Sequence, residues 1–174
     1  MTELASREAR AAELRRFLDL VIRQGRFDFT YEVKLLDAPL LSGGSGGDVA
    51  LDSPEILVTL GGRDRDLLLE RNAELLLALE YLAQRWLRLD PQSLHLVRFD
   101  SGDYRSIRAE ELKLSARVAA DRVRETHSPF RFNPMSARDR RIIHLVLQDS
   151  PGVRTASEGA GAERQVVIFP ADTK

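Results

Sequence analysis

Residues 138–151 read RDRRIIHLVLQDSP, an apolar helical pattern that is headed by three arginines. Ser136 and Asp139 fit an S-x-x-D capping box, so the helix is predicted to begin directly after Ser136. Arg140 and His144 are four residues apart, which places them one turn apart on the same face. A cation near a helix N-terminus opposes the helix dipole, whereas a phosphate is attracted by free backbone N–H groups and by guanidinium groups. The pattern therefore allows a phosphate-binding surface.

A solvated edge is the alternative interpretation of the same stretch. In it, Arg138 and Arg141 face water, Arg140 pairs with the carboxylate of Asp139 or Asp149, and His144 is half-buried. Spacing alone favours this solvated edge over a binding surface.

The surrounding patterns predict alternating helices and strands. Helical periodicity covers residues 2–24, 66–89 and 103–126, and strand patterns cover residues 27–38, 55–62 and 93–100. The glycine-rich residues 41–48 are predicted to form a loop between two strands. After the arginine-headed helix come a turn at residues 149–152, a loop that contains SEGAGAE, and a strand at residues 164–169.

This order of elements argues for an α+β protein with small mixed sheets. Residues 127–134 contain two prolines and little periodicity, so they are the best candidate for a linker. We therefore expect one domain over residues 1–126 and a second over residues 127–174.

Composition narrows the classes of function. The chain has no cysteine, which excludes disulfides, zinc knuckles and thiol nucleophiles. Its formal net charge of −1 gives no overall preference for acidic or basic partners. The N-terminus is charged, and no apolar run reaches the roughly 18 residues of a membrane span. We expect a soluble, cytoplasmic protein that does not insert into membranes.

The residues around Arg140 and His144 carry a family resemblance. NPMSARDRRIIHLVLQDSPGVRTASEGAGAERQVVI, residues 133–168, resembles the R-three-H domain, a small nucleic-acid-binding module named for its Arg-xxx-His pair. More closely, it resembles the C-terminal part of the Jag (KhpB, SpoIIIJ-associated) family. The shared features are the pattern PM-x-A-x-x-RRIIH-x-x-LQ, the tripeptide SEG and the terminal R-x-VVI.

The resemblance implies a basic face that binds single-stranded RNA or DNA. Arg140 and His144 carry over as the motif pair, and Arg141 and Arg164 match further positions of the family pattern. Arg138 and Arg154 are added only from their charge and proximity. Phosphate contacts of this type give affinity with little sequence information, and the affinity falls steeply with salt.

The family places a KH domain before the R-three-H unit, and the upstream sequence is similar to it. ILVTLGGRDRDLLLERNAELLLALEYLAQRW, residues 56–86, resembles the KH region, and FDSGDYRSIRAEEL, residues 99–112, matches the family segment D-x-x-x-Y-R-x-x-R. The resemblance implies a KH-like α/β sandwich followed by a small α/β R-three-H domain. We expect the chain to begin with the first helix of the KH region, without the additional N-terminal domain of the family.

The GxxG loop that clamps nucleic acid in KH domains is degenerate here. Its positions are occupied by Glu70, Arg71, Asn72 and Ala73, so both glycines are missing and a carboxylate stands first. The favoured interpretation is a continuous helix that serves as scaffold. The alternative is a protein-binding face for a second KH-type protein or a second copy, since the leucines of residues 67–79 exceed what one helical face requires.

No pattern of an enzyme is present. The three histidines are far apart and fit no metal motif, and Asp64 and Asp66 are predicted to cap a helix rather than bind metal. Tyr81 and Trp86 are predicted to be core residues rather than a base-stacking platform. The leading hypothesis is a non-enzymatic protein without cofactor that binds single-stranded nucleic acid, RNA in particular. The alternative is a protein-interaction adaptor that has lost nucleic-acid binding.

Overall fold

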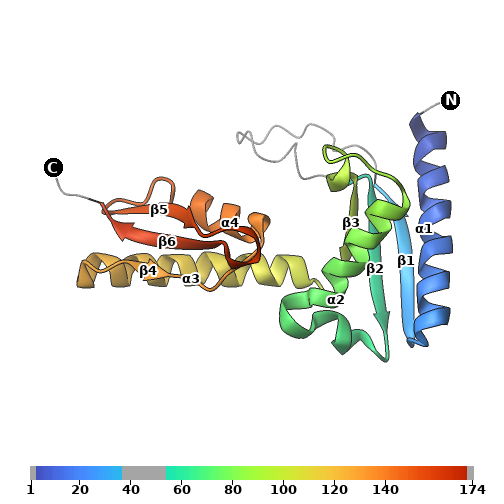
Figure 1. The fold of residues 1–174 in the computed structure, drawn as a ribbon, viewed down its shortest axis with the longest axis horizontal. Coiled ribbons are helices and arrows are strands. Elements are labelled where there is room, and N and C mark those ends of the chain that lie inside the picture. Colours follow the sequence, from blue (N-terminus) through green and yellow to red (C-terminus); the bar gives the residue numbers. More distant parts are fainter. Residues whose placement is uncertain (1–2, 37–53, 172–174) are drawn as a thin grey trace. The chain divides into compact units, whose positions relative to one another are not determined.

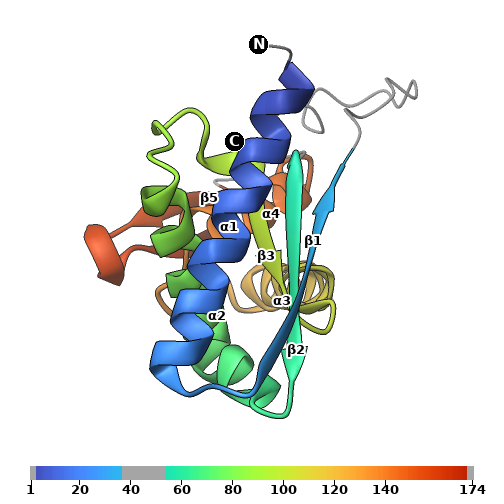
Figure 2. The ribbon, with the colours of Figure 1, turned by 90° about the vertical axis from the view of Figure 1, so that its right-hand side faces the viewer.

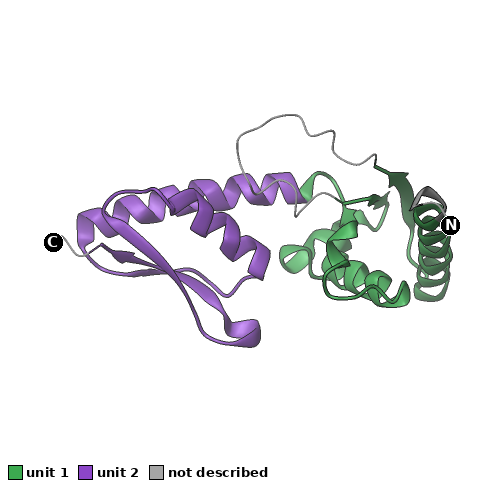
Figure 3. Ribbon diagram, turned by 90° about the horizontal axis from the view of Figure 1, so that it is seen from above, with its two compact units in different colours: residues 1–104 green, residues 105–174 purple. Residues whose placement is uncertain are grey.

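The computed structural model describes residues 3–36 and 54–171, and it shows the α+β class that the sequence predicts (Figure 1). The loop predicted at residues 41–48 lies outside the described residues. The chain divides into two compact units, Met1–Tyr104 and Arg105–Lys174, which we call unit 1 and unit 2 (Figure 3). Unit 1 contains α1 (Glu3–Gly25), β1 (Phe29–Leu35), β2 (Ile56–Gly62), α2 (Arg65–Trp86) and β3 (Val97–Asp100). The second unit is built from α3 (Tyr104–Thr126), β4 (Phe130–Arg131), α4 (Ala137–Leu147), β5 (Val153–Glu158) and β6 (Gln165–Pro170).

Unit 1 is a three-stranded sheet covered on one face by two helices (Figure 2). The strand order is β1-β2-β3, with β1 antiparallel and β3 parallel to the central strand. Ile56, Val58 and Leu60 of β2 are buried because alternate side chains of a strand point to the same face. They form one core with α1 and α2, to which Leu14, Leu18, Leu68, Leu76 and Phe99 also belong.

Two polar side chains of α2 close the free edge of β3. The backbone N–H of Phe99 donates to the Glu80 carboxylate at 2.7 Å. The Gln84 amide donates to the carbonyl oxygens of Leu94 and Val97, at 2.8 and 3.3 Å. Both side chains are buried, so strand groups that could otherwise pair with another chain are satisfied inside unit 1.

The helix α2 is broken at residues 70–73, which the family resemblance aligns with the GxxG loop. Glu70 is extended, and Arg71, Asn72 and Ala73 are left-handed with φ of 50°, 60° and 60°. The hydroxyl of Tyr104 donates to the Asn72 carbonyl at 2.8 Å, and Ala73 is buried in the core. The favoured expectation of a continuous helix is therefore wrong. The chain makes a tight turn here although both glycines are absent.

We predict that Arg71→Gly stabilises unit 1. Left-handed backbone costs a non-glycine residue about 1–2 kcal/mol, and glycine avoids that cost. Arg71 is exposed, so little packing is lost, and the free energy of unfolding is expected to rise by about 1 kcal/mol in urea denaturation. Arg85→Gly, at an exposed helical position of α2, is the matched control and is expected to lower it by about 1 kcal/mol. An equal decrease in the free energy of unfolding in both variants would show that the left-handed turn is not strained.

Unit 2 is a second sheet, ordered β4-β6-β5 and antiparallel throughout, with α3 and α4 on one face. The sequence did not predict strand β5, because VRTASE has few residues of high strand propensity. In the structure β5 pairs with β6, and Thr155 lies opposite Ile168. The units divide between Tyr104 and Arg105 rather than at the expected residues 126 and 127. The reason is that Leu112, Ala116 and Val123 of α3 are buried in the second core.

Candidate functional site

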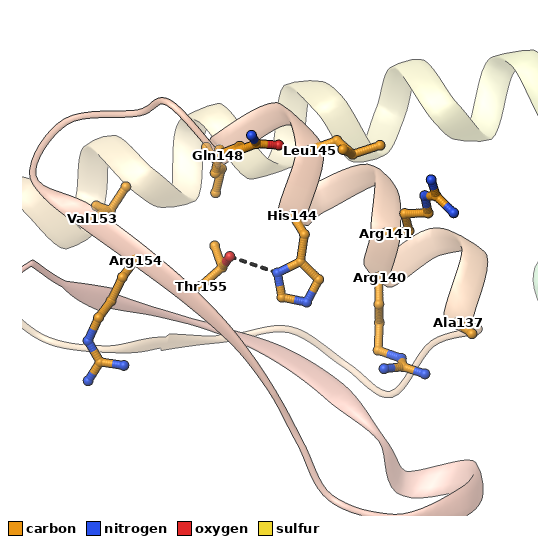
Figure 4. A pocket seen from close by; sticks show the side chains of 10 residues that line it. Ala137, Arg140, Arg141, His144, Leu145, Gln148, Val153, Arg154 and Thr155 are labelled. Atoms are coloured by element: carbon orange, nitrogen blue, oxygen red, sulfur yellow. Dashed lines mark hydrogen bonds between the residues drawn. The ribbon is translucent and has the colours of Figure 1, made fainter. Parts of the chain in front are cut away.

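The helix α4 is oriented by its N-cap and by its apolar side. The Ser136 hydroxyl accepts from the backbone N–H of Asp139 at 3.1 Å, which confirms the predicted cap. Ile143 and Leu147 are buried in the core of unit 2. Because these two residues face inward, the helix turns Arg140 and His144 toward the neighbouring strand β5 (Figure 4).

Arg140 and His144 belong to a hydrogen-bonded network with two hydroxyl groups of β5. The His144 ring nitrogens lie 2.7 Å (Nδ1) from the Thr155 hydroxyl and 2.9 Å (Nε2) from the Ser157 hydroxyl. The Arg140 guanidinium donates to the same Ser157 hydroxyl at 3.1 Å. Both motif residues are half-buried, so the pair also holds α4 against β5.

The expected partner of Arg140 differs in the structure. Its guanidinium bonds to Ser157, whereas the carboxylate of Asp139 lies 3.5 Å from the guanidinium of Arg108 on α3. Thr155 and Ser157 were not predicted as members of the site. In a strand, alternate residues lie on the same face, so Thr155 and Ser157 share the face of the buried Val153. This signal would have identified both hydroxyl groups if residues 153–158 had been predicted as a strand.

A groove of about 490 Å³ lies between α4 and β5 (Figure 4). Its lining includes four of the predicted residues, namely Arg140, Arg141, His144 and Arg154. The Arg154 guanidinium lies 4.3 Å from the centroid of the Phe169 ring, a cation–π contact that orients it. Of the other two predicted contacts, Arg138 and Arg164 are exposed and are not among the described residues that line the groove.

Burial and charge together favour a neutral His144. Desolvation of the half-buried ring lowers the pKa of His144, and the positive charge of Arg140 lowers it further. A neutral ring fits the network, because each neighbouring hydroxyl group can either donate or accept. At neutral pH the positive charge of the groove therefore comes from its arginines.

Comparison with known proteins identifies the unit that carries this groove. Residues 110–170 match the family model of the R-three-H domain. Unit 2 is an R-three-H domain. The match begins within α3, in agreement with the packing of that helix in the core of the R-three-H domain.

Relatives with the name RNA-binding protein KhpB extend the similarity into unit 1. The chain is 32% identical to the Clostridium symbiosum protein over 114 residues, 66% of this chain and 51% of the relative. It is 31% identical to the Bacillus subtilis protein over 133 residues, 75% of this chain and 64% of the relative. With the Streptococcus pneumoniae D39 protein the identity is 35% over 97 residues, 56% of this chain and 30% of the relative. The chain thus spans about half the length of the first relative, and the predicted resemblance to the Jag family is confirmed.

Neither a metal centre nor a membrane span accompanies the groove in the described part of the chain. Within residues 3–36 and 54–171, no three histidine, aspartate or glutamate side chains gather into a group that could hold a metal ion. Among the helices of the same residues, none is long and apolar enough to cross a membrane.

We predict that the R-three-H domain loses stability below neutral pH through His144. The folded domain lowers the pKa of this histidine, so the unfolded chain binds a proton more readily. The contribution of the neutral His144 ring to stability is fully present above the ordinary histidine pKa of about 6.5. It is lost as the pH falls from that value through the lower pKa that His144 has in the folded domain.

The measurement is thermal unfolding between about pH 8 and pH 5. The decrease in Tm on acidification is expected to be larger in the wild type than in His144→Gln, which carries no titratable ring. Parallel decreases in the two proteins would show that His144 does not carry this part of the pH dependence.

Proposed function

We propose that the protein binds single-stranded nucleic acid, RNA in particular, through the α4–β5 groove, and that it catalyses no reaction. The presence of Arg140, Arg141 and Arg154 in the lining of one groove carries this proposal. Guanidinium groups bind phosphate through paired, charge-assisted hydrogen bonds, and the positive charge supplies affinity without base specificity. The relatives in three bacteria are named RNA-binding proteins, which supports RNA as the ligand and a bacterial setting. We propose the cytoplasm as the location, as the sequence predicts.

The groove residues differ in the roles that their environments support. Arg141 and Arg154 are exposed and are best suited to phosphate contacts. Arg140 is half-buried and bonded to Ser157, so it contributes charge and also positions β5. No carboxylate is present among the described residues that line the groove, so no like charge there opposes a bound phosphate. Exposed Arg138 and Arg164 remain predicted contacts outside it.

The test is a titration of labelled single-stranded RNA with the full chain at roughly 50 and 200 mM salt. Arg141→Ala/Arg154→Ala is expected to lower the affinity at least about tenfold, because two charge-assisted contacts are lost. The slope of log affinity against log salt is expected to fall by about 1.4, since each phosphate neutralised on a single strand contributes about 0.7.

Arg15→Ala/Arg23→Ala is the charge-matched control. It removes two exposed arginines from α1 in unit 1, and both the affinity and the salt slope are expected to stay close to those of the wild type. Equal losses of RNA affinity in the two double variants would show that the effect comes from the net charge of the protein rather than from the groove.

Protein contact through unit 1 is a second proposed function. We infer a KH-like unit from the order α1-β1-β2-α2-β3 and from the break in α2. Beyond the break, α2 exposes Leu77, Tyr81 and Leu82, which supports a contact surface for a second KH-type protein or a second copy. Complete absence of RNA binding at low salt would leave this adaptor function as the proposal.

A further inference from the structure

Trp86 in unit 1 does not lie in the core, where its leucine-rich sequence context predicted it. Its side chain, at the end of α2, is 47% exposed. The indole ring lies against Phe17 of α1, with ring centroids 5.8 Å apart and planes tilted by 48°. The ring also lines a pocket of about 570 Å³ together with Ser6, Ala9, Arg10, Glu13, Leu87 and Arg88. One aromatic ring is therefore supported from within unit 1 and accessible from outside.

The charges around this pocket are arranged in favour of an anion. Arg10 and Arg7 both pair with Glu55, at 3.0 and 3.5 Å, so that carboxylate is neutralised and Arg10 is held in place. The carboxylate of Glu13, the acidic residue in the lining, is bound by Arg16 at 2.7 Å. These pairs offset the negative charge near the ring.

Arg88 adds a further cation to the lining of this pocket. It is the left-handed residue, with φ of 54°, of the turn that ends α2, which is a common way for a helix to end. The backbone N–H of Arg88 donates to the Arg85 carbonyl at 3.0 Å, and that of Leu89 donates to the Gln84 carbonyl at 3.1 Å. This turn places Arg88 at the pocket beside the exposed indole.

We propose that this pocket binds one unstacked nucleobase of a single-stranded nucleic acid, stacked on Trp86, with Arg10 and Arg88 directed to the adjoining phosphates. The proposal rests on the proposed function and adds a second contact point, in unit 1. Stacking on an aromatic ring tolerates every base, because each base has a π-face. An apolar peptide side chain would fill the pocket without using the arginines, so the charge favours a nucleotide.

The test uses the fluorescence of Trp86, the single tryptophan of the chain. A short oligouridylate is titrated into the full chain, and binding is followed in parallel by the anisotropy of a labelled copy. Quenching is expected to saturate together with the anisotropy. In Arg141→Ala/Arg154→Ala the Trp86 fluorescence is still expected to be quenched, because the pocket is intact, but the quenching is expected to require a higher RNA concentration.

Three variants at exposed positions of unit 1 separate stacking from folding. Trp86→Leu is expected to lower the RNA affinity about tenfold, the lower part of the range for one stacked base. Trp86→Phe keeps an aromatic face and is expected to retain most of the affinity. Leu20→Ala is the control, since Leu20 is 41% exposed on α1 but is not part of the pocket lining, and its affinity is expected to be unchanged.

The outcomes distinguish this proposal from the proposed function. RNA binding in the anisotropy assay without any change in Trp86 fluorescence would overturn the nucleobase pocket and leave the α4–β5 groove as the binding site. Equal losses in Trp86→Phe and Trp86→Leu would also overturn it, because the aromatic face would then be irrelevant. Absence of binding in both assays would refute both proposals.

Discussion

Replacing Ile143 with alanine is expected to unfold the R-three-H domain and to leave unit 1 folded. Ile143 is fully buried in the core of the R-three-H domain, and removing a buried isoleucine side chain down to alanine costs about 2–5 kcal/mol. Domains have a total stability of only about 5–15 kcal/mol, and small ones lie at the lower end. Unit 1 has a separate core, so it is expected to be unaffected.

Hydrogen exchange followed by mass spectrometry resolves the two units in one experiment. The amides of α4 and β6 are expected to lose protection in Ile143→Ala, whereas those of β2 keep it. Leu145→Ala is the control on the same helix, because Leu145 is 43% exposed, and its stability is expected to change by less than about 0.5 kcal/mol. Loss of protection in β2 as well would show that the two cores unfold as one.

The second large effect is expected at Glu80, which closes the edge of β3. Its carboxylate accepts from the backbone N–H of Phe99 and lies 3.8 Å from the guanidinium of Arg98. In Glu80→Leu, the Phe99 N–H loses this acceptor and the mostly buried Arg98 loses this carboxylate. Breaking a buried pair in this way costs about 3–5 kcal/mol.

Glu80→Gln is the conservative control for this prediction. The glutamine oxygen can still accept from the Phe99 N–H, so the loss of stability is expected to be smaller than in Glu80→Leu. Urea denaturation followed by Trp86 fluorescence reports on unit 1, where both residues lie. Equal stability of Glu80→Leu and the wild type would show that the edge contact contributes nothing to folding.

The parts of the site that could be predicted from the sequence are those set by local patterns. The Ser136 cap and the shared face of Arg140 and His144 follow from spacing within one helix, and both residues line the groove together with Arg141. Arg154, the fourth predicted residue in the lining, lies on β5 and was predicted from charge and proximity alone. Their partners Thr155 and Ser157 were missed, because the pairing of β5 depends on β6 rather than on its own residues.

The break in α2 shows why other features could not be predicted. Glu70, Arg71 and Ala73 all favour helix locally, and no glycine indicates a left-handed turn. The observed turn depends on contacts across unit 1, namely the burial of Ala73 and the hydrogen bond from Tyr104 to Asn72. Trp86 is the converse case, since a helical leucine-rich context predicted burial where the packing leaves the ring half-exposed.

The network that joins Arg140, Ser157, His144 and Thr155 has a consequence for the speed of recognition. These side chains are already held by protein hydrogen bonds, so an arriving strand would find a preorganised groove and would lose little side-chain freedom within it. Association would then be governed by electrostatic encounter rather than by rearrangement of the protein. Arg140 and His144 would thus hold the groove in one conformation, and the exposed arginines beside them would determine the association rate constant.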